Sequence, residues 1–320
     1  MTVIATLLAS IFFPVLTTVT GCGLEVKLDE RTSFLQTGTD GSVKSEYSNL
    51  SIDISLGRHV ALGFRNRLNR LVDGADFIKA TDNLYLDLLA GSLELRVGKA
   101  QQEYGGFEYD DALPDLYYCG MYYNNFVGAF NWGVRASKVW EKGRLNLQAA
   151  VSPFATSPGE GLYAWNLCYK GTHGIWSPKW SVNLIDTPQD WRAGHLVLGN
   201  SFAAGPLTLE LDYITRTDLR DFRPFEDWSL VSKLKYSAAT FIDVFAKVNL
   251  DRNLSVEDLF VPAGTSCTAW GGGIEIFPRG EKRNLRLHLV YCNNGEHNIS
   301  AGITWKMKLF KLYKNENHSP

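Results

Sequence analysis

The chain has 320 residues and a formal net charge of −2 at pH 7, so its charge gives no sign of a nucleic-acid partner. Its mean hydropathy of −0.13 excludes a protein built mainly of membrane-spanning helices. Aromatic residues make up 12% of the chain and glycines number 29, a composition that favours β structure with many turns.

The first 22 residues have the character of an export signal. Val3 to Leu16 is mostly apolar, long enough for a signal-peptide core but short for a spanning helix. Val19-Thr20-Gly21-Cys22 resembles a lipobox, which would make Cys22 a lipid-anchored first residue. Ordinary signal cleavage nearby is the alternative. We therefore predict a signal peptide over 1–22 and an exported mature chain.

After the signal, runs of roughly ten residues alternate apolar and polar side chains between Gly, Asn, Asp and Pro turns. Leu285, Leu287 and Leu289, for example, alternate with Arg286 and His288. Period two places each set on one face of a strand. About sixteen such runs occur, at 30–38, 45–56, 58–69, 82–90, 92–99, 128–140, 143–152, 161–170, 176–186, 192–203, 206–216, 226–236, 240–250, 267–277, 284–292 and 297–307.

An even number of such strands is typical of bacterial outer-membrane barrels. We predict an all-β fold, a transmembrane antiparallel β-barrel over 23–307, followed by a C-terminal tail over 308–320. The connections support this prediction, because odd-numbered ones such as 39–43, 70–81 and 99–127 are longer than even-numbered ones such as Gly57 and Gly91. Long outer loops and short periplasmic turns are the outer-membrane pattern. A soluble β-sandwich or β-propeller is the alternative fold.

The longest connection, 99–127, combines carboxylates with aromatic residues. Long loops in compact domains are usually functional or disordered, and this one is too aromatic for a disordered linker. It either folds into the mouth of the barrel and narrows it, or packs on the rim; the spacing leaves both open. As a constriction loop it would use Glu103, Tyr104, Phe107, Glu108, Tyr109, Asp110 and Asp111.

The polar faces of the strands would line a channel, and their charges lean basic. Rings of Arg and Lys favour anions. The alternative is that these charges pair across neighbouring strands and only keep the lumen wet. The predicted pore-lining and anion-binding residues are Arg65, Arg67, Arg96, Arg135, Lys233, Lys235 and Arg286, with Lys170, Arg216, Lys247 and Lys306 on the same face.

Arg65 and Arg67 are the sharpest feature of this wall, because both would point inward from one strand. Their guanidinium groups could hold phosphate, sulfate or carboxylate bidentately. They could instead bridge to the acidic 99–127 loop and hold it in place. We slightly favour the bridge, since it also explains why that loop is acidic.

Four short stretches carry a family resemblance, in order and over nearly all of the mature chain. They are Phe64-Arg65-Asn66-Arg67-Leu68-Asn69, Val97-Gly98-Lys99-Ala100-Gln101, Gly105-Gly106-Phe107-Glu108-Tyr109-Asp110 and Gly302-Ile303-Thr304-Trp305. With these motifs the chain resembles outer-membrane porins related to phosphate-selective porins O and P.

The resemblance implies a trimeric barrel in the outer membrane of a Gram-negative bacterium that passes small hydrophilic solutes. It also implies that Arg65, Arg67 and Arg96 stand in an inward-facing basic ladder. A full lysine-rich ladder is not matched, so a general or weakly selective pore is predicted. The expected partners are outer-membrane lipid, small hydrophilic solutes or anions, and further copies of the chain as a homotrimer.

Two other functions compete with a pore. A barrel hydrolase would need a nucleophile and a base close together, and His288 with Ser300 is the best pair. No nucleophile elbow or HExxH motif is present, so we predict that the chain is not an enzyme. A soluble carbohydrate-binding β protein is the second rival, because of the aromatic strands. The sequence predicts no metal site, no cofactor and no nucleic-acid partner.

Overall fold

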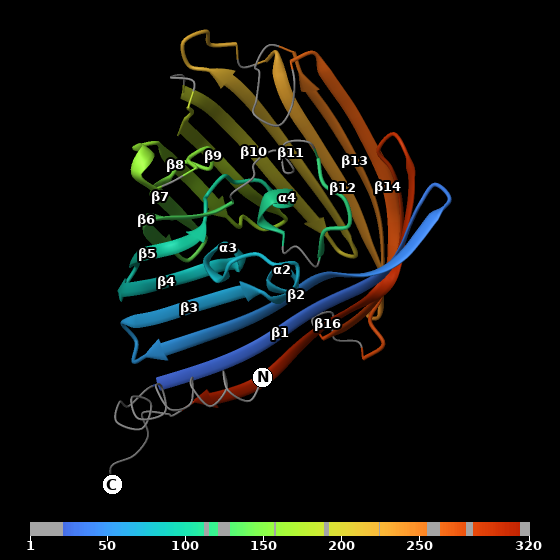
Figure 1. The fold of residues 1–320 in the computed structure, drawn as a ribbon, viewed down its shortest axis with the longest axis horizontal. Coiled ribbons are helices and arrows are strands. Elements are labelled where there is room, and N and C mark those ends of the chain that lie inside the picture. The colour runs from blue at the N-terminus through green and yellow to red at the C-terminus, as the bar shows by residue number, and fades with distance from the viewer. Residues whose placement is uncertain are drawn as a thin grey trace.

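The chain folds into a closed β-barrel (Figure 1). The computed structural model describes residues 22–111, 115–120, 129–156, 158–188, 192–223, 225–254, 263–279 and 284–313. Sixteen antiparallel strands follow one another around the barrel, and the first pairs with the last. Closure leaves no unpaired sheet edge, which a membrane-spanning sheet requires. The predicted transmembrane barrel is confirmed, and the sandwich and propeller alternatives are wrong.

The strands are β1 (Cys22–Thr37), β2 (Asp40–Leu56), β3 (Val60–Arg67), β4 (Thr81–Ala90), β5 (Leu93–Gln101), β6 (Phe130–Trp140), β7 (Gly143–Val151), β8 (Tyr163–Gly171), β9 (Trp176–Asp186), β10 (Arg192–Ala204), β11 (Leu207–Asp218), β12 (Asp227–Ala239), β13 (Ile242–Asn253), β14 (Thr265–Ile276), β15 (Leu285–Asn293) and β16 (His297–Tyr313). The short helices are α2 (Leu68–Val72), α3 (Phe77–Ala80), α4 (Phe107–Asp110) and the 3₁₀ turn η2 (Pro158–Glu160). Within the described residues, no helix is both long and apolar enough to cross a membrane.

The alternation of side chains explains why this sheet closes with a wet interior. On β5, Leu93 and Leu95 face outward and are 55% and 39% exposed. On β13, Asp243 and Lys247 face inward and are buried. A barrel wall with an apolar outer band and a polar lumen suits a bilayer, because each face meets the solvent that its side chains match.

Several strands are longer than the sequence pattern predicts, and β1 and β16 extend the furthest. β1 begins at Cys22 instead of 30, and β16 continues to Tyr313 instead of 307. The two extensions pair with each other from Gly23 opposite Tyr313 onward, so each satisfies the backbone groups of the other. The predicted tail is therefore wrong over 308–313. Residues 314–320 lie outside the described residues, as does the predicted signal over 1–22 except for Cys22, with which β1 begins.

Most connections match the predicted alternation, but the even-numbered β14–β15 connection spans residues 277–284, and two odd-numbered ones are short. The 39–43 connection was expected to be long, but β1 and β2 meet in a tight turn whose Gly38 has a φ of 58°. The β15–β16 connection spans only residues 294–296. The turn is tight because β1 and β2 pair continuously up to Thr37 and Asp40. The loops after β3 and β5 remain long, and both carry short helices.

Candidate functional site

The loop after β5 turns into the barrel, where Figure 1 shows α4 inside the ring of strands. Its aromatic side chains Tyr104 and Tyr109 are buried and pack with Ile185, Val197 and other inward apolar residues. Gly105 permits this approach, because its φ is +76° and an added Cβ would lie 2.8 Å from Ser181 Oγ.

Asp212 on β11 fixes the start of α4. Its carboxylate accepts hydrogen bonds from the backbone N–H groups of Phe107 and Glu108, each at 2.8 Å. Asp212 is almost fully buried, so these bonds supply the partners that its polar atoms need away from water. They hold the helix against the wall.

The acidic part of the loop is paired with basic residues of the wall. Glu103 forms an ion pair with Arg135, lies 2.9 Å from Lys170 Nζ and accepts a 3.0 Å hydrogen bond from Asn146. Asp110 lies 2.8 Å from Lys170 Nζ as well. Burial opposes ionisation of Glu103, but the two cations outweigh it and lower its pKa to about 2.

A second anchor joins α4 to the opposite wall. Glu108 Oε1 lies 2.5 Å from Lys247 Nζ, and both side chains are at most 5% exposed. Lys247 also donates to the Tyr118 carbonyl at 2.8 Å, and the Tyr118 hydroxyl donates to the Lys247 carbonyl at 2.8 Å. Glu108 accepts a further hydrogen bond from Gly120 N at 3.0 Å.

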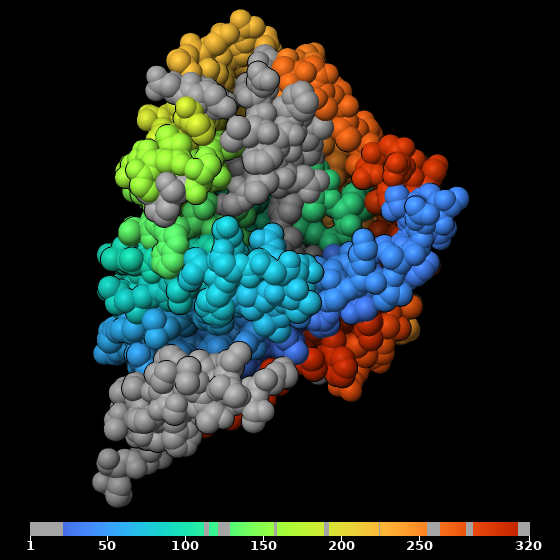
Figure 2. All heavy atoms as spheres, viewed as in Figure 1, coloured from blue at the N-terminus to red at the C-terminus, as the bar shows by residue number. Residues whose placement is uncertain are grey.

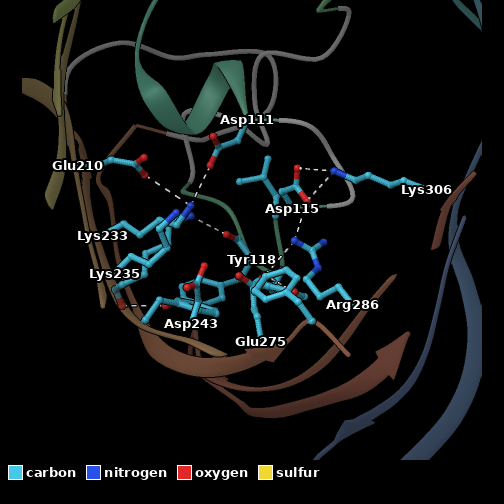
Figure 3. Close-up of a pocket in the computed structure, with 15 residues that line it drawn as sticks. Asp111, Asp115, Tyr118, Glu210, Lys233, Lys235, Asp243, Glu275, Arg286 and Lys306 are labelled. Atoms are coloured by element: carbon cyan, nitrogen blue, oxygen red, sulfur yellow. Dashed lines mark hydrogen bonds and ion pairs between the residues drawn. The ribbon is translucent and has the colours of Figure 1, made fainter. Parts of the chain in front are cut away.

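The carboxylates next along the chain reach β12, β15 and β16 (Figure 3). Asp111 lies 3.0 Å from Lys233 Nζ. Asp115 lies 2.7 Å from Arg286 Nη1 and 3.0 Å from Lys306 Nζ. Burial would raise the pKa of Asp115, but the neighbouring Arg286 and Lys306 lower it. The loop thus contacts walls on both sides of the lumen.

Arg65 and Arg67 do not reach the carboxylates of the described loop, so the predicted bridge is wrong. Asp82 Oδ2 lies 2.7 Å from Arg67 Nε and 4.0 Å from Arg65 Nε. A register shift between β3 and β4 at Arg65 and Asn66 explains the pairing, because it leaves Asp82 without a strand partner beside both guanidinium groups. Arg96 is likewise paired with Asp87, at 2.7 and 2.8 Å.

Two cavities lie in the lumen, and the segment Leu116–Tyr118 lines both of them. The larger one, of about 510 Å³, includes Arg67 and lies toward the long loops. The smaller one, of about 300 Å³, lies toward the short turns and is drawn in Figure 3. Tyr117 and Tyr118 belong to the 99–127 connection but are not among the residues predicted to form the constriction.

Tyr117 is held from several sides. Its hydroxyl donates to Glu275 at 2.7 Å, and the guanidinium carbons of Arg31 and Arg286 lie 5.4 and 5.6 Å from its ring centroid. The His288 ring lies 4.7 Å away. Burial raises the pKa of Tyr117, so it stays a neutral hydrogen-bond donor. Arg31 also donates to the Leu116 carbonyl at 2.7 Å.

The smaller cavity is electrically mixed. Its basic and acidic lining residues are equal in number: Lys233, Lys235, Lys247, Arg286 and Lys306 against Asp111, Asp115, Glu210, Asp243 and Glu275. Lys233 and Arg286 pair across neighbouring strands, with Glu210 and Glu275. Most pairs of this wall, however, join its cations to Asp111, Asp115 and Glu108 of the inner loop. Within the described part of the chain, Lys235 is the cation of this cavity that has no carboxylate within 4.0 Å.

His288 and Ser300 do meet, with His288 Nε2 3.0 Å from the Ser300 hydroxyl. The same nitrogen lies 3.3 Å from Ser33, whose hydroxyl donates to Glu46. His288 Nδ1 is buried and has no hydrogen-bond partner among the described residues. A hydrolytic triad needs an acid on that nitrogen, so this group is not arranged as one.

No protein-family model matches the chain, and no curated protein matches it. Solved structures do match the chain. A loop-deletion mutant of OmpT, an outer membrane protein of Vibrio cholerae, superposes with a TM-score of 0.68 at 12% identity over 89% of this chain and 99% of that one. A trimer form of OmpT gives 0.66 at 12% identity, over 90% and 100%. A mutant of Rhodopseudomonas blastica porin gives 0.59 at 14% identity, over 89% and 100%.

These likenesses and the closed sheet place the chain in one class of fold: the sixteen-stranded antiparallel barrel of outer-membrane proteins. Porins are among the solved neighbours. At identities of 11–14% the likeness extends to the fold alone, and the finer resemblance to phosphate-selective porins O and P stays a prediction.

Proposed function

We propose that the protein is a porin: a water-filled channel for passive diffusion of small hydrophilic solutes across the outer membrane of a Gram-negative bacterium. One observation carries this proposal. A closed barrel encloses two polar cavities, of about 510 and 300 Å³, stacked between its long-loop and short-turn ends. A polar lumen behind an apolar outer band is the arrangement that admits water.

The constriction in this proposal is made by Leu116–Tyr118, since this segment lines both cavities. The acidic stretch Glu103–Asp111 acts as its anchor, because its carboxylates are bound to wall cations and its aromatic residues are packed against strands. Solutes then pass beside Tyr117, between the loop and the wall of β11–β16.

Selectivity in this proposal is weak. Most of the predicted anion-binding residues are neutralised by direct pairs, including Arg65 and Arg67 with Asp82. Lys235 is the residue through which a small anion preference would act, since it lines the smaller cavity without a described carboxylate partner. Phosphate would be one permeant anion among several. A homotrimer is part of the proposal, supported by the trimer form of the similar OmpT.

Single-channel recording of the refolded mature chain in a planar bilayer tests the function. Stepwise conductance is expected, with a reversal potential near zero or slightly anion-leaning in a salt gradient. No conductance from a correctly folded barrel would contradict the pore. A second candidate, an outer-membrane hydrolase, would then be tested by ester hydrolysis and its loss in Ser300→Ala, although the arrangement around His288 disfavours it.

A further inference from the structure

An apolar groove of about 590 Å³ runs along the outer wall of the barrel, at the short-turn ends of β3 to β7. Its raised sides are Leu88 on β4, Leu95 on β5 and Leu147 on β7, which are 42%, 39% and 57% exposed. Between Leu95 and Leu147 the sheet places Ala136 on β6, whose short side chain leaves the floor of the groove low. Figure 2 shows the short-turn ends of β3, β4 and β5 at the left margin of the viewed face, in blue to teal. A hydrocarbon chain lying in this groove would contact protein atoms on more than one side.

The short-turn end of the groove is basic. Lys138 follows Ala136 on the outward face of β6, and its Nζ lies 2.5 Å from Ser92 Oγ in the β4–β5 turn. At the β3 side, Arg58 donates to His59 Nε2 at 3.1 Å, and His59 lines the groove. Among the described residues, no carboxylate oxygen lies within 4.0 Å of the charged groups of Lys138 and Arg58. Both cations therefore keep donors for an anionic group.

Neighbouring aromatic residues mark how deep Lys138 lies in the membrane. Trp140, the next outward residue toward the turn, is 43% exposed and stacks on Tyr169 with ring centroids 5.9 Å apart. Trp and Tyr side chains gather where the hydrocarbon core meets the headgroups. Lys138 comes two residues earlier, about 7 Å further into the bilayer along the strand. Its ammonium turns back toward Ser92 and so reaches the headgroup level, where lipid phosphates lie.

We propose that this groove is a binding site for one phospholipid of the periplasmic leaflet, with an acyl chain along Ala136 and the phosphate on Lys138. The inference rests on the proposed outer-membrane porin and adds a ligand to its outer wall. Both parts of the ligand are matched, because the apolar sides fit the chain and a cation without a described counter-ion fits the phosphodiester. The leaflet follows from the short turns, which mark the periplasmic side of the barrel.

Native mass spectrometry of the protein, extracted from outer membranes in a mild detergent, tests the site. Dioleoylphosphatidylglycerol is the probe, and dioleoylglycerol, which has the same chains but no phosphate, is the control ligand. We expect one saturable phosphatidylglycerol adduct per chain and about tenfold weaker binding of dioleoylglycerol. No saturable adduct, or equal binding of the two lipids, would overturn the proposal.

Two variants locate the adduct. Ala136→Trp fills the groove and should abolish the adduct, and Lys138→Gln should weaken it about tenfold. The matched controls are Ala246→Trp and Arg252→Gln, which make the corresponding changes at outward positions of β13 and should bind the probe as the wild type does. Heat-modifiable migration on gels shows that each variant barrel is folded. Folded groove variants that bind the probe like the wild type would overturn the assignment.

A second copy of the chain is the competing occupant of the groove. Leu147 replaced by p-benzoylphenylalanine and irradiated in intact outer membranes should yield a lipid-bearing monomer, and a cross-linked dimer would overturn the proposal. Conductance of the mass-spectrometry samples separates the hypotheses. Conducting barrels without the lipid adduct contradict only the lipid site, and barrels with the adduct but without conductance contradict only the pore.

Discussion

Replacing Glu108 by glutamine should release the inner loop from β13. The substitution leaves Lys247 charged and buried without its counter-ion, since both side chains are at most 5% exposed. Breaking a buried ion pair by removing one partner costs about 3–5 kcal/mol. At about 1.4 kcal/mol per factor of ten, the ratio of docked to undocked loop falls by roughly 10² or more.

Single-channel recording is the assay for this change. We expect Glu108→Gln to give larger current fluctuations and a higher mean conductance than the wild type, because α4 loses its ion pair to Lys247 on β13 and the buried lysine is left uncompensated. The matched control is Glu108→Leu with Lys247→Met, which removes both charges together, leaves no uncompensated buried charge and should be quieter than Glu108→Gln. A single variant with wild-type noise and conductance would refute the claim that this pair holds the loop.

Three further predictions concern the same lumen. Tyr117→Ala should join the two cavities and raise conductance, whereas Tyr117→Phe should change it little; equal conductance in all three proteins would mean that solutes bypass Tyr117. Acid should loosen the loop. The pKa of Glu103 is lowered from 4.5 to about 2, so its contribution to the stability of the docked loop is complete above pH 4.5 and is lost as the pH falls toward 2. We expect current noise to rise over that range, and Glu103→Gln to show the higher noise already at neutral pH. Lys235→Gln should shift the reversal potential toward cation preference, and an unchanged potential would remove Lys235 from the selectivity mechanism.

The fold can be predicted from the sequence because the alternation of apolar and polar residues along a strand is a local property. The apolar–polar period of Leu285 to Leu289 needs no knowledge of neighbouring strands, and the length of the runs matches a bilayer. The extension of β1 from Cys22 was missed, although Leu24 and Val26 already alternate with charged residues. The residues that pair with this extension are those of β16 that the sequence predicts to be a tail. Only the pairing of β1 with β16 explains why both extensions are ordered.

The site was harder to predict, because side-chain pairing depends on which strands become neighbours. Arg65 and Arg67 could be placed on an inward face from their spacing, but their partner Asp82 became adjacent only through a register shift between β3 and β4. The acidic character of the inner loop was visible in the sequence. That Glu108 would pair with Lys247, at a separation of 139 residues, was not.

The sequence by itself determined the class of fold, the polar lumen and the composition of the inner loop, since these follow from period-two patterning and from residue type. Only the tertiary structure decided which charges cancel and that Leu116–Tyr118 lines both cavities. The physical reason is the same in each case. Coulombic and hydrogen-bond interactions act over a few ångströms, and in a barrel those neighbours are set by strand register and closure, across long stretches of chain.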